Sequence, residues 1–446
     1  MNITENLSTQ DILKRLSEKN YTEIFNIRSR VEASDWERIA VENLKQNIFA
    51  NPNRYPNTKN VLYVHIPFCA TRCDYCPYYT TPYTSQKITD YLDALEKEIE
   101  NIKNTPFIKS TTFSSVYFGG GTPSVLSAEN IKRIVYKIFN SFNFDKDGEF
   151  SFESNPSTLN EEKIIALKSS GMNRVSLGIQ TFSDRFLKEM HCAHTPEKAK
   201  QIINLLLDYG FTVNIDMIYG LIGQTKEHLE YDMEVLNSFG APHQVTLFPL
   251  RIATHTPLGE ELERKEGITI KAHFKRLLEF DAFIEKTMLN NNYFREESPV
   301  FYHKKGAYEH KYHSTETRIV GIGSSAGTLL DDGEGCNFHN VDEYISAINE
   351  NRDPAISGVA LNQQQAYERF ILYRIIYMNR SLPNFKEIVE QRFMEHYGVP
   401  MGDIYDKVLE DMRRLRFIKS GTDKIIFTDR LWMVLNKVKI GMPSIL

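Results

Sequence analysis

The chain has few cysteines, few tryptophans and no long apolar run. Its 446 residues include 5 cysteines and 2 tryptophans. An odd number of cysteines, mostly in one short stretch, argues against the disulfide framework of a secreted domain. No run of about 18 apolar residues occurs, so no membrane-spanning helix is expected. The first residues have neither a basic start nor an apolar core, so we expect a cytoplasmic protein without a secretory leader.

An excess of positive charge is also missing. The chain carries 53 Lys and Arg against 58 Asp and Glu, a formal net charge of −5. This balance offers no general attraction to nucleic acid or to an anionic membrane, so neither is expected as a partner. No internal repeat or low-complexity tract is evident. Hydrophobic residues make up 41% of the chain, enough for a sizeable core and more than one domain.

Three of the cysteines, Cys69, Cys73 and Cys76, form a C-x3-C-x2-C motif after the apolar run 61–66. Three thiolates at this spacing can hold one face of an iron-sulfur cube and leave its fourth iron without a protein ligand. Zinc is the main alternative, with His65 as the candidate fourth ligand, although zinc sites usually pair two C-x2-C units. Unliganded thiols are the third interpretation. The spacing favours the cluster.

Short apolar runs alternate with amphipathic helical stretches from residue 61 to residue 250. The expected strands are 61–66, 115–118, 149–153, 174–178, 213–218 and 244–249, and the expected helices are 85–104, 127–140, 160–170, 196–209 and 225–239. Thr158 and Glu161 have the spacing of a capping box before the third helix. Alternating strands and helices predict a parallel sheet, either open or partly closed into a barrel. The ligand site is then expected at the carboxyl ends of the strands.

Several unusual residues fall at these carboxyl ends. A Gly119-Gly120-Gly121-Thr122-Pro123 turn follows the second strand. Glycines there let a ligand approach the backbone closely, although a tight turn alone also explains them. Glu153 ends the third strand, Gln180 ends the fourth and Asp216 lies on the fifth. An inward carboxylate on an apolar strand is costly unless it is paired, which favours a functional role for Glu153 and Asp216.

The stretch from Tyr63 to Cys76 resembles the signature of radical S-adenosylmethionine (SAM) enzymes. More narrowly, it is similar to the branch of oxygen-independent coproporphyrinogen dehydrogenase, a related heme chaperone, class C radical SAM methyltransferases and anaerobic heme-degrading enzymes. The resemblance implies an α/β fold with a (β/α)6 partial TIM barrel. It also implies a 4Fe-4S cluster on the three motif cysteines, whose open iron binds SAM. Electron transfer from the cluster then cleaves SAM to a 5'-deoxyadenosyl radical.

The same resemblance implies which residues surround SAM. They are Tyr63, Gly119, Gly120, Gly121, Thr122, Glu153, Gln180 and Asp216. One position departs from the family pattern, because Cys192 stands where an Arg associated with the SAM carboxylate is expected. A thiol cannot replace a bidentate guanidinium. Either another cation such as Arg174 reaches that carboxylate, or the match is displaced and Cys192 is simply packed.

The substrate follows from finer features of the resemblance. Pro77 and Tyr78 follow Cys76 where coproporphyrinogen dehydrogenase has a further cysteine, and the chaperone's His-Asn and Tyr-Trp pairs are missing from 302–327. The turn at 321–327 looks most like that of the heme-degrading methyltransferases. This implies two SAM molecules, heme or another tetrapyrrole as substrate, and a low-potential electron donor such as flavodoxin. A class C methyltransferase acting on another sp2 carbon and a heme-trafficking protein without turnover are the alternatives. The sequence does not identify a catalytic acid or hydrogen donor.

Residues 293–313 interleave aromatic side chains with His303, His310 and His313. Neutral imidazole is a common axial ligand of heme iron, so at least one of the three is expected to contact heme iron or a propionate. An exposed loop with three ordinary histidines is the alternative.

Four segments are expected along the chain. They are a helical N-terminal extension (1–56), the radical SAM partial barrel (57–260), a substrate-side extension (261–355) and a winged-helix-like C-terminal domain (356–446). In the last segment, helices near 362–380, 384–397 and 403–415 precede two strands joined at 420–423. Such modules often bind DNA, but the acidic balance favours a cover over the substrate side of the barrel.

Overall fold

The structure, a computed structural model, describes residues 44–414 with gaps, and beyond them residues 417–419 and 425. The gaps are 56–57, 79, 241–242, 251, 253–255, 265–269, 296–298, 305–317, 332 and 379–383. Most of the expected N-terminal extension, His310, His313 and the turn expected at 420–423 therefore lie outside the described residues.

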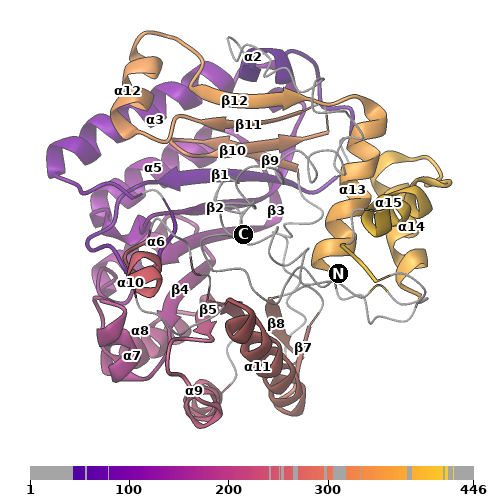
Figure 1. Cartoon of the computed structure of the whole chain (residues 1–446). Coiled ribbons are helices and arrows are strands. Elements are labelled where there is room, and N and C mark those ends of the chain that lie inside the picture. The colour runs from indigo at the N-terminus through magenta and orange to yellow at the C-terminus, as the bar shows by residue number, and fades with distance from the viewer. Residues whose placement is uncertain are drawn as a thin grey trace.

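Among the described residues, twelve strands form one mixed sheet (Figure 1). They are β1 (Asn60–Ile66), β2 (Thr112–Gly120), β3 (Asn143–Ser154), β4 (Arg174–Gln180), β5 (Thr212–Tyr219), β6 (Gln244–Pro249), β7 (Tyr293–Phe294), β8 (Val300–His303), β9 (Arg318–Ile322), β10 (Gly327–Leu330), β11 (Gly333–Asn337) and β12 (Ala355–Ala360). Their spatial order is β12-β11-β10-β9-β1-β2-β3-β4-β5-β6-β8-β7. Strand β9 and strands β1 to β6 run parallel. The sheet is open, which confirms the partial barrel.

Helices connect the parallel strands and cover the outer face of the sheet. The helices up to residue 290 are α2 (Leu44–Ile48), α3 (Ser85–Ile102), α4 (Pro106–Lys109), α5 (Ala128–Ser141), α6 (Glu161–Ser169), α7 (Asp184–Glu189), α8 (Pro196–Asp208), α9 (Lys226–Ser238), α10 (Pro257–Arg264) and α11 (Ile270–Asn290). All six strands and all five helices expected between residues 61 and 250 are present. Within the described segments, no helix combines the length and apolarity needed to cross a bilayer.

The predicted capping box at Thr158 is wrong. Helix α6 has Asn160 as its N-cap, and the Asn160 side chain accepts a hydrogen bond from the Lys163 amide at 3.0 Å. An N-cap stands directly before the first helical residue, which places Asn160 rather than Thr158 within reach of that amide. The Thr158 hydroxyl instead lies 2.6 Å from the Ser124 hydroxyl.

Side chains of the parallel strands alternate between an apolar outer face and a polar inner face, as the strand period requires. The outer face packs under the helices and forms the main core, with Val64, Phe118, Phe152, Leu177, Ile215 and Leu247 among its members. The inner face carries Tyr117, Glu153, Arg174, Ser176, Asn214, Asp216, Gln244 and Thr246. The core thus lies between sheet and helices, and the polar chemistry lies inside the curve of the sheet.

Strands beyond residue 250 extend the sheet on both sides. Strand β9 pairs in parallel with β1, and Ile319 lies opposite Val61. Strand β8 pairs antiparallel with β6, and Val300 lies opposite Thr246. Strands from the expected barrel and from the expected substrate-side extension therefore share one sheet, and the division between these two segments stays a prediction.

The later helices are α12 (Val341–Asn349), α13 (Gln363–Tyr377), α14 (Phe385–Tyr397) and α15 (Ile404–Arg414). Helices α13, α14 and α15 gather at one side of the sheet (Figure 1). They enclose a second core that includes Ile371, Val389, Phe393, Val408 and Met412. The three helices match those expected for a winged-helix-like module, whereas its hairpin falls largely outside the described residues and stays a prediction.

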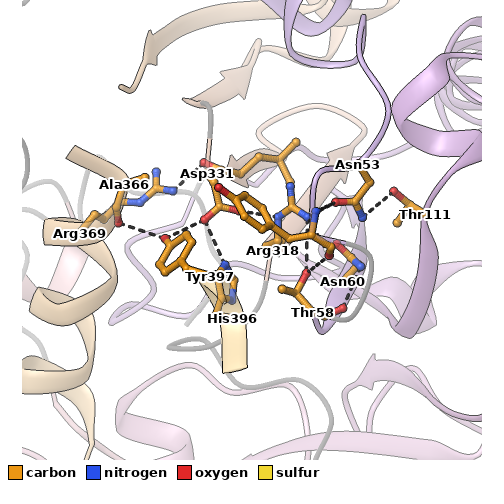
Figure 2. Close-up of polar contacts among 12 residues, drawn as sticks. Asn53, Thr58, Asn60, Thr111, Arg318, Asp331, Ala366, Arg369, His396 and Tyr397 are labelled. Carbon is orange, nitrogen blue, oxygen red and sulfur yellow. Dashed lines mark hydrogen bonds and ion pairs between the residues drawn. The ribbon is translucent and has the colours of Figure 1, made fainter. Parts of the chain in front are cut away.

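A buried polar network joins these helices to the sheet (Figure 2). The Nε of Arg318 on β9 lies 2.7 Å from Oδ2 of Asp331, which follows β10. Oδ1 of Asp331 lies 3.1 Å from Nε2 of His396 and accepts a hydrogen bond from the Tyr397 hydroxyl at 2.9 Å. The Arg318 guanidinium also donates to the Asn53 side chain. One ion pair thus links the segment before β1, the sheet and α14.

Candidate functional site

A cavity of about 330 Å³ lies at the carboxyl ends of the parallel strands. Such a volume is typical of small-molecule sites, which span roughly 300–1,000 Å³. The three motif cysteines line one part of the cavity, and polar side chains of β3 to β6 line its floor. Phe248, Leu250 and Val300 contribute an apolar wall. The cavity thus lies at the strand ends, where the sequence predicts the ligand site.

Backbone hydrogen bonds hold the cysteine loop against the glycine-rich turn. The Gly121 amide donates to the Ile66 carbonyl at 2.8 Å, and the Thr122 amide donates to the Phe68 carbonyl at 2.8 Å. A Cβ on Gly121 would lie 2.6 Å from the Phe68 carbonyl oxygen, so only glycine fits there. The Thr122 hydroxyl lies 3.4 Å from the Cys69 sulfur. The turn after β2 thus positions the first cysteine of the motif.

The three thiols share this part of the cavity without converging on one point. Across the part of the chain that the structure describes, no three His, Cys, Asp or Glu side chains gather closely enough to hold a single metal ion. Zinc needs its sulfur ligands at about 2.3 Å from one ion, whereas a 4Fe-4S cube binds thiolates at separate corners. Burial raises the pKa of Cys69 and raises that of Cys76 to about 12. Three cysteine sulfurs in one part of the cavity are the donor set that a cube with one open corner requires.

His65 and Tyr63 lie on β1, next to cavity-lining residues but not in the lining themselves. Nδ1 of His65 lies 3.1 Å from the Tyr63 hydroxyl, and burial lowers the pKa of His65 to about 3. The His65 ring occupies the space that a Cβ on Gly120 would need, at 2.7 Å, which indicates packing rather than metal ligation. Tyr63 is fully buried and stacks on Tyr117, with ring centroids 6.3 Å apart. Tyr117 lines the cavity, and the expected contact of Tyr63 with SAM stays a prediction.

Glu153 faces the cavity from the end of β3, as expected. Its Oε1 accepts a hydrogen bond from the Tyr117 hydroxyl at 2.8 Å, and its Oε2 accepts one from the Gly120 amide at 3.1 Å. A Cβ on Gly119 would lie 3.0 Å from both side chains, so this glycine leaves room for the Tyr117–Glu153 pair. Burial raises the pKa of Glu153 to about 7. The carboxyl group can therefore hold or release a proton near neutral pH.

Asp216 faces the same cavity from β5. It accepts hydrogen bonds from the Ser176 hydroxyl and from the Asn214 amide, both at 2.7 Å, and burial raises its pKa. Arg174 also lines the cavity and donates to Ser151 at 3.1 Å and to Gln244 at 2.8 Å. The alternative cation that the sequence suggested for the SAM carboxylate is thus part of the site.

Gln180 lines the cavity in an unusual backbone conformation. Its φ is 69°, and the Thr181 amide donates to the Ile179 carbonyl at 2.8 Å. A hydrogen bond that spans one residue with positive φ is a γ-turn of the rarer and strained form. The β4–β5 register shifts at the same place, between Gly178 and Gln180.

Cys192 lies beside the cysteine loop. The Asp74 amide donates to the Met190 carbonyl at 3.2 Å, and Oδ2 of Asp74 lies 2.7 Å from Nδ1 of His191. Cys192 forms a side-chain hydrogen bond with Cys73, which lowers the pKa of the Cys73 thiol. The residue that replaces the expected Arg thus contacts a cysteine of the motif.

His303 lies on the outer face of the sheet. On β8, Val300 and Tyr302 lie opposite the inward-facing Thr246 and Gln244. By the strand period, His303 points the other way, and its ring packs on Tyr293 with centroids 4.9 Å apart. His303 is not among the side chains that line the cavity, and its expected contact with heme stays a prediction. His310 and His313 lie outside the described residues and stay predictions.

Sequence reasoning missed most of the polar floor. Arg174 and Ser176, Asn214 and Asp216, and Gln244 and Thr246 are pairs two residues apart on three neighbouring strands. A polar residue at every second position of an otherwise apolar strand was the available signal, since such residues share one face.

Comparisons with known proteins agree with this geometry. A family model described as the radical SAM superfamily matches residues 63–236. A heme chaperone of Lactococcus lactis subsp. lactis is 27% identical over 383 residues, which are 85% of this chain and 96% of that protein. The anaerobilin synthase of Escherichia coli O157:H7 is 33% identical over 206 residues, 46% of either chain.

The structure of coproporphyrinogen III oxidase from Escherichia coli, described as a radical SAM enzyme, is also similar. It has a TM-score of 0.70 and 23% identity, and the match covers 93% of this chain and 96% of that one. This similarity shows the fold, and the motif and the family match supply the chemistry. Residues 63–236 therefore form a radical SAM domain with a 4Fe-4S cluster and SAM as its cofactors, and most of the chain is similar to heme chaperones and oxygen-independent coproporphyrinogen oxidases.

Proposed function

We propose that the protein is a radical SAM methyltransferase that methylates and opens heme without oxygen, releasing iron and a linear tetrapyrrole. The observation that carries this proposal is the continuity of the cavity. The cysteine loop, the polar floor and the apolar wall of Phe248, Leu250 and Val300 border one space. A flat and mostly apolar ring beside SAM suits that combination. The curated relatives named above are a heme chaperone and an anaerobilin synthase, and others are coproporphyrinogen III oxidases, all with names from tetrapyrrole chemistry.

The residues after the cysteine motif favour heme opening over coproporphyrinogen oxidation. Pro77 and Tyr78 stand where the coproporphyrinogen enzymes have a further cysteine. The match to anaerobilin synthase has the higher identity, 33% against 27% for the chaperone named above, although it covers only 46% of the chain.

The residues of the cavity take the following roles in this proposal. Cys69, Cys73 and Cys76 hold the cluster. When bound, the cluster and two SAM molecules supply the radical chemistry and the transferred carbon. Gly120, Gly121 and Thr122 present backbone and hydroxyl groups to the SAM amino acid end, and Glu153, Gln180 and Asp216 orient its polar groups. Because its pKa is about 7, Glu153 is the group best suited to exchange a proton at its Oε atoms.

A heme-binding protein without turnover is the second candidate. The specific observation in its favour is the length of the chaperone match, 85% of this chain at 27% identity, against 46% for anaerobilin synthase. Both candidates need the cluster and a tetrapyrrole, so product analysis must separate them.

The test is anaerobic incubation of the cluster-reconstituted chain with SAM, heme and a low-potential reductant such as reduced flavodoxin. Loss of the Soret band with S-adenosylhomocysteine, free iron and a methylated linear tetrapyrrole is the expected result. Heme binding without SAM consumption would support the chaperone instead. Formation of 5'-deoxyadenosine with intact heme would show a working radical site and a wrong substrate. Cys69→Ala is the negative control, and Cys336→Ala is the matched control, because Cys336 is buried in β11 outside the cavity.

A further inference from the structure

Asp232 is a carboxylate on the outer helix α9 with only 1% of its surface exposed. It does not line the cavity, yet it is bound to the turn that follows β4. Its Oδ1 accepts a hydrogen bond from the Phe182 amide at 2.7 Å. The Thr181 hydroxyl lies 3.0 Å from Oδ1 and 2.8 Å from Oδ2. Burying a carboxylate costs free energy, and an apolar side chain would pack as well at this position. A functional role would explain why a carboxylate is found here.

The reason lies one residue earlier, at Gln180. The positive φ of 69° at Gln180 and the Thr181-to-Ile179 hydrogen bond define a strained γ-turn. Such a conformation persists only where the surrounding structure enforces it, and strain of this kind clusters at ligand sites. Asp232 binds the two residues directly after Gln180, and the Thr181 hydroxyl also accepts a hydrogen bond from the Ser183 amide at 3.1 Å. The carboxylate thus fixes the exit of the turn from outside the barrel.

The γ-turn at Gln180 also shapes the cavity. Gln180 and Gly178 both line it, and the Gln180 side chain folds back over Gly178. A Cβ on Gly178 would lie 3.0 Å from Nε2 of Gln180. A relaxed turn would move this amide away from the strand end where Asp216 lies opposite Gly178.

We propose that Asp232 is a positioning residue for SAM, which holds Gln180 in the γ-turn and thereby fixes one wall of the SAM site. The proposal rests on the assignment of Gln180 to that site and is independent of heme as the substrate. It gives a functional role to a side chain that touches neither cofactor.

The test measures the affinity of the full-length, cluster-reconstituted protein for SAM, from the change that SAM causes in the electron paramagnetic resonance spectrum of the reduced cluster. Asp232→Asn keeps the shape of the side chain but removes its charge and replaces one of the two acceptor oxygens near the Thr181 hydroxyl by an NH2 donor. Thr181→Val removes the hydroxyl, and Thr181→Ser retains it. We expect roughly tenfold weaker SAM binding in Asp232→Asn and Thr181→Val, the loss of one hydrogen bond to a charged group, and nearly normal binding in Thr181→Ser.

Asp331→Asn is the matched control. Asp331 is equally a buried and multiply bonded carboxylate, but neither it nor its partners line the cavity. It should lower the melting temperature and leave SAM affinity unchanged. If Asp232→Asn behaves in the same way, Asp232 is structural only and the proposal is overturned. Should Asp232→Asn fail to fold, the Thr181→Val and Thr181→Ser pair decides, because equal affinities would also overturn it.

A double-mutant cycle tests the route through Gln180. Gln180→Gly accepts positive φ without strain. In that background Asp232→Asn should lower the melting temperature less than in the wild-type chain, because the turn at residue 180 is then less strained and depends less on the hydrogen bonds from Asp232. Equal losses in both backgrounds would contradict the proposed route. A wild-type protein whose intact cluster shows no spectral response to SAM would remove the site assignment and this proposal together, whatever happens to heme.

Discussion

Arg318 on β9 forms an ion pair with Asp331, directly after the neighbouring antiparallel strand β10, with 2.7 Å between Nε and Oδ2 and side chains only 4% and 7% exposed. The same carboxylate accepts hydrogen bonds from α14, so it joins the sheet to the C-terminal helices (Figure 2). Burial alone would raise the pKa of Asp331, but the hydrogen bond from His396 and the charge of Arg318 hold it well below its ordinary value.

Removal of this charge should destabilise the protein. We expect Asp331→Asn to lower the free energy of unfolding by about 3 kcal/mol, because it leaves the buried Arg318 without its counter-charge. A carboxyl group with a lowered folded pKa stabilises above its ordinary pKa of about 4 and loses that contribution as pH falls further. The difference from wild type should therefore be constant from pH 8 to pH 5 and shrink below about pH 4.

Guanidinium unfolding across this pH range checks the prediction. Asp406→Asn is the control, since its pair with Lys386 is at the surface, with 2.9 Å between the charged atoms and side chains 45% and 64% exposed. It should cost less than about 1 kcal/mol. Equal effects of the two substitutions would show that the buried network stabilises the protein no more than a surface ion pair does.

The contact between the glycine-rich turn and the cysteine loop predicts a loss of cluster in Gly121→Ala. Its Cβ would lie 2.6 Å from the Phe68 carbonyl oxygen, so the loop that carries Cys69 must move. We expect iron per chain after anaerobic reconstitution to fall to less than about half of the wild-type value, because metal sites tolerate little displacement of their supports. Gly240→Ala is strained as well, because φ at Gly240 is 69°, but its Cβ meets nothing within 4 Å, so it should reconstitute fully. Full iron content in Gly121→Ala would mean that the loop is free to adjust.

The raised pKa of Glu153 predicts a pH-dependent stability. A carboxyl group with a pKa of about 7 in the folded chain and about 4.3 when unfolded binds more protons in the folded state between these values. Stability of the cluster-free and SAM-free protein should therefore fall as pH rises from 5 to 8. Glu153→Gln should flatten this part of the melting-temperature profile, whereas the exposed Glu100→Gln should not. An unchanged slope in Glu153→Gln would assign the effect to another group.

The contact between Cys192 and Cys73 predicts a shift in the reduction potential of the cluster. Hydrogen bonds to cluster sulfurs raise that potential, so Cys192→Ala should lower it without loss of iron. Cys192→Ser retains a donor and should lie nearer to wild type. Redox titration followed by electron paramagnetic resonance measures the potential, and Cys336→Ala serves as the control. A large loss of iron in Cys192→Ala would instead make Cys192 a cluster ligand.

The barrel could be predicted from the sequence because its strands and helices have clear periods. Strands β1 to β6 are apolar on their outer face, and helices such as α3 carry regular apolar stripes. Strands β9 to β11 escaped prediction because glycines such as Gly321, Gly327 and Gly333 lower their apparent strand propensity. Tertiary pairing forms these strands, since β9 pairs with β1, β10 with β9 and β11 with β10, and no local signal reports it.

Within the site, the sequence identified residues that belong to a motif and charged residues whose burial is costly. Glu153 and Asp216 stood out as carboxylates on apolar strands, and both line the cavity. The face on which His303 lies depends on the register between β8 and β6, which composition does not reveal. Asp232 gave no signal, since a carboxylate on an amphipathic helix normally faces water.

The parallel pairing of β9 with β1 also has a consequence for biosynthesis. Residues 60–64 find their partners only at residues 318–322. A ribosome makes the chain from its N-terminus at about 5–20 residues per second, so one edge of β1 stays unpaired for on the order of ten seconds or more. The cysteine loop begins directly after this strand. If the cluster were inserted during this time, β1 would still lack one of its neighbouring strands. We therefore expect the cluster to be inserted after the ribosome has passed β9.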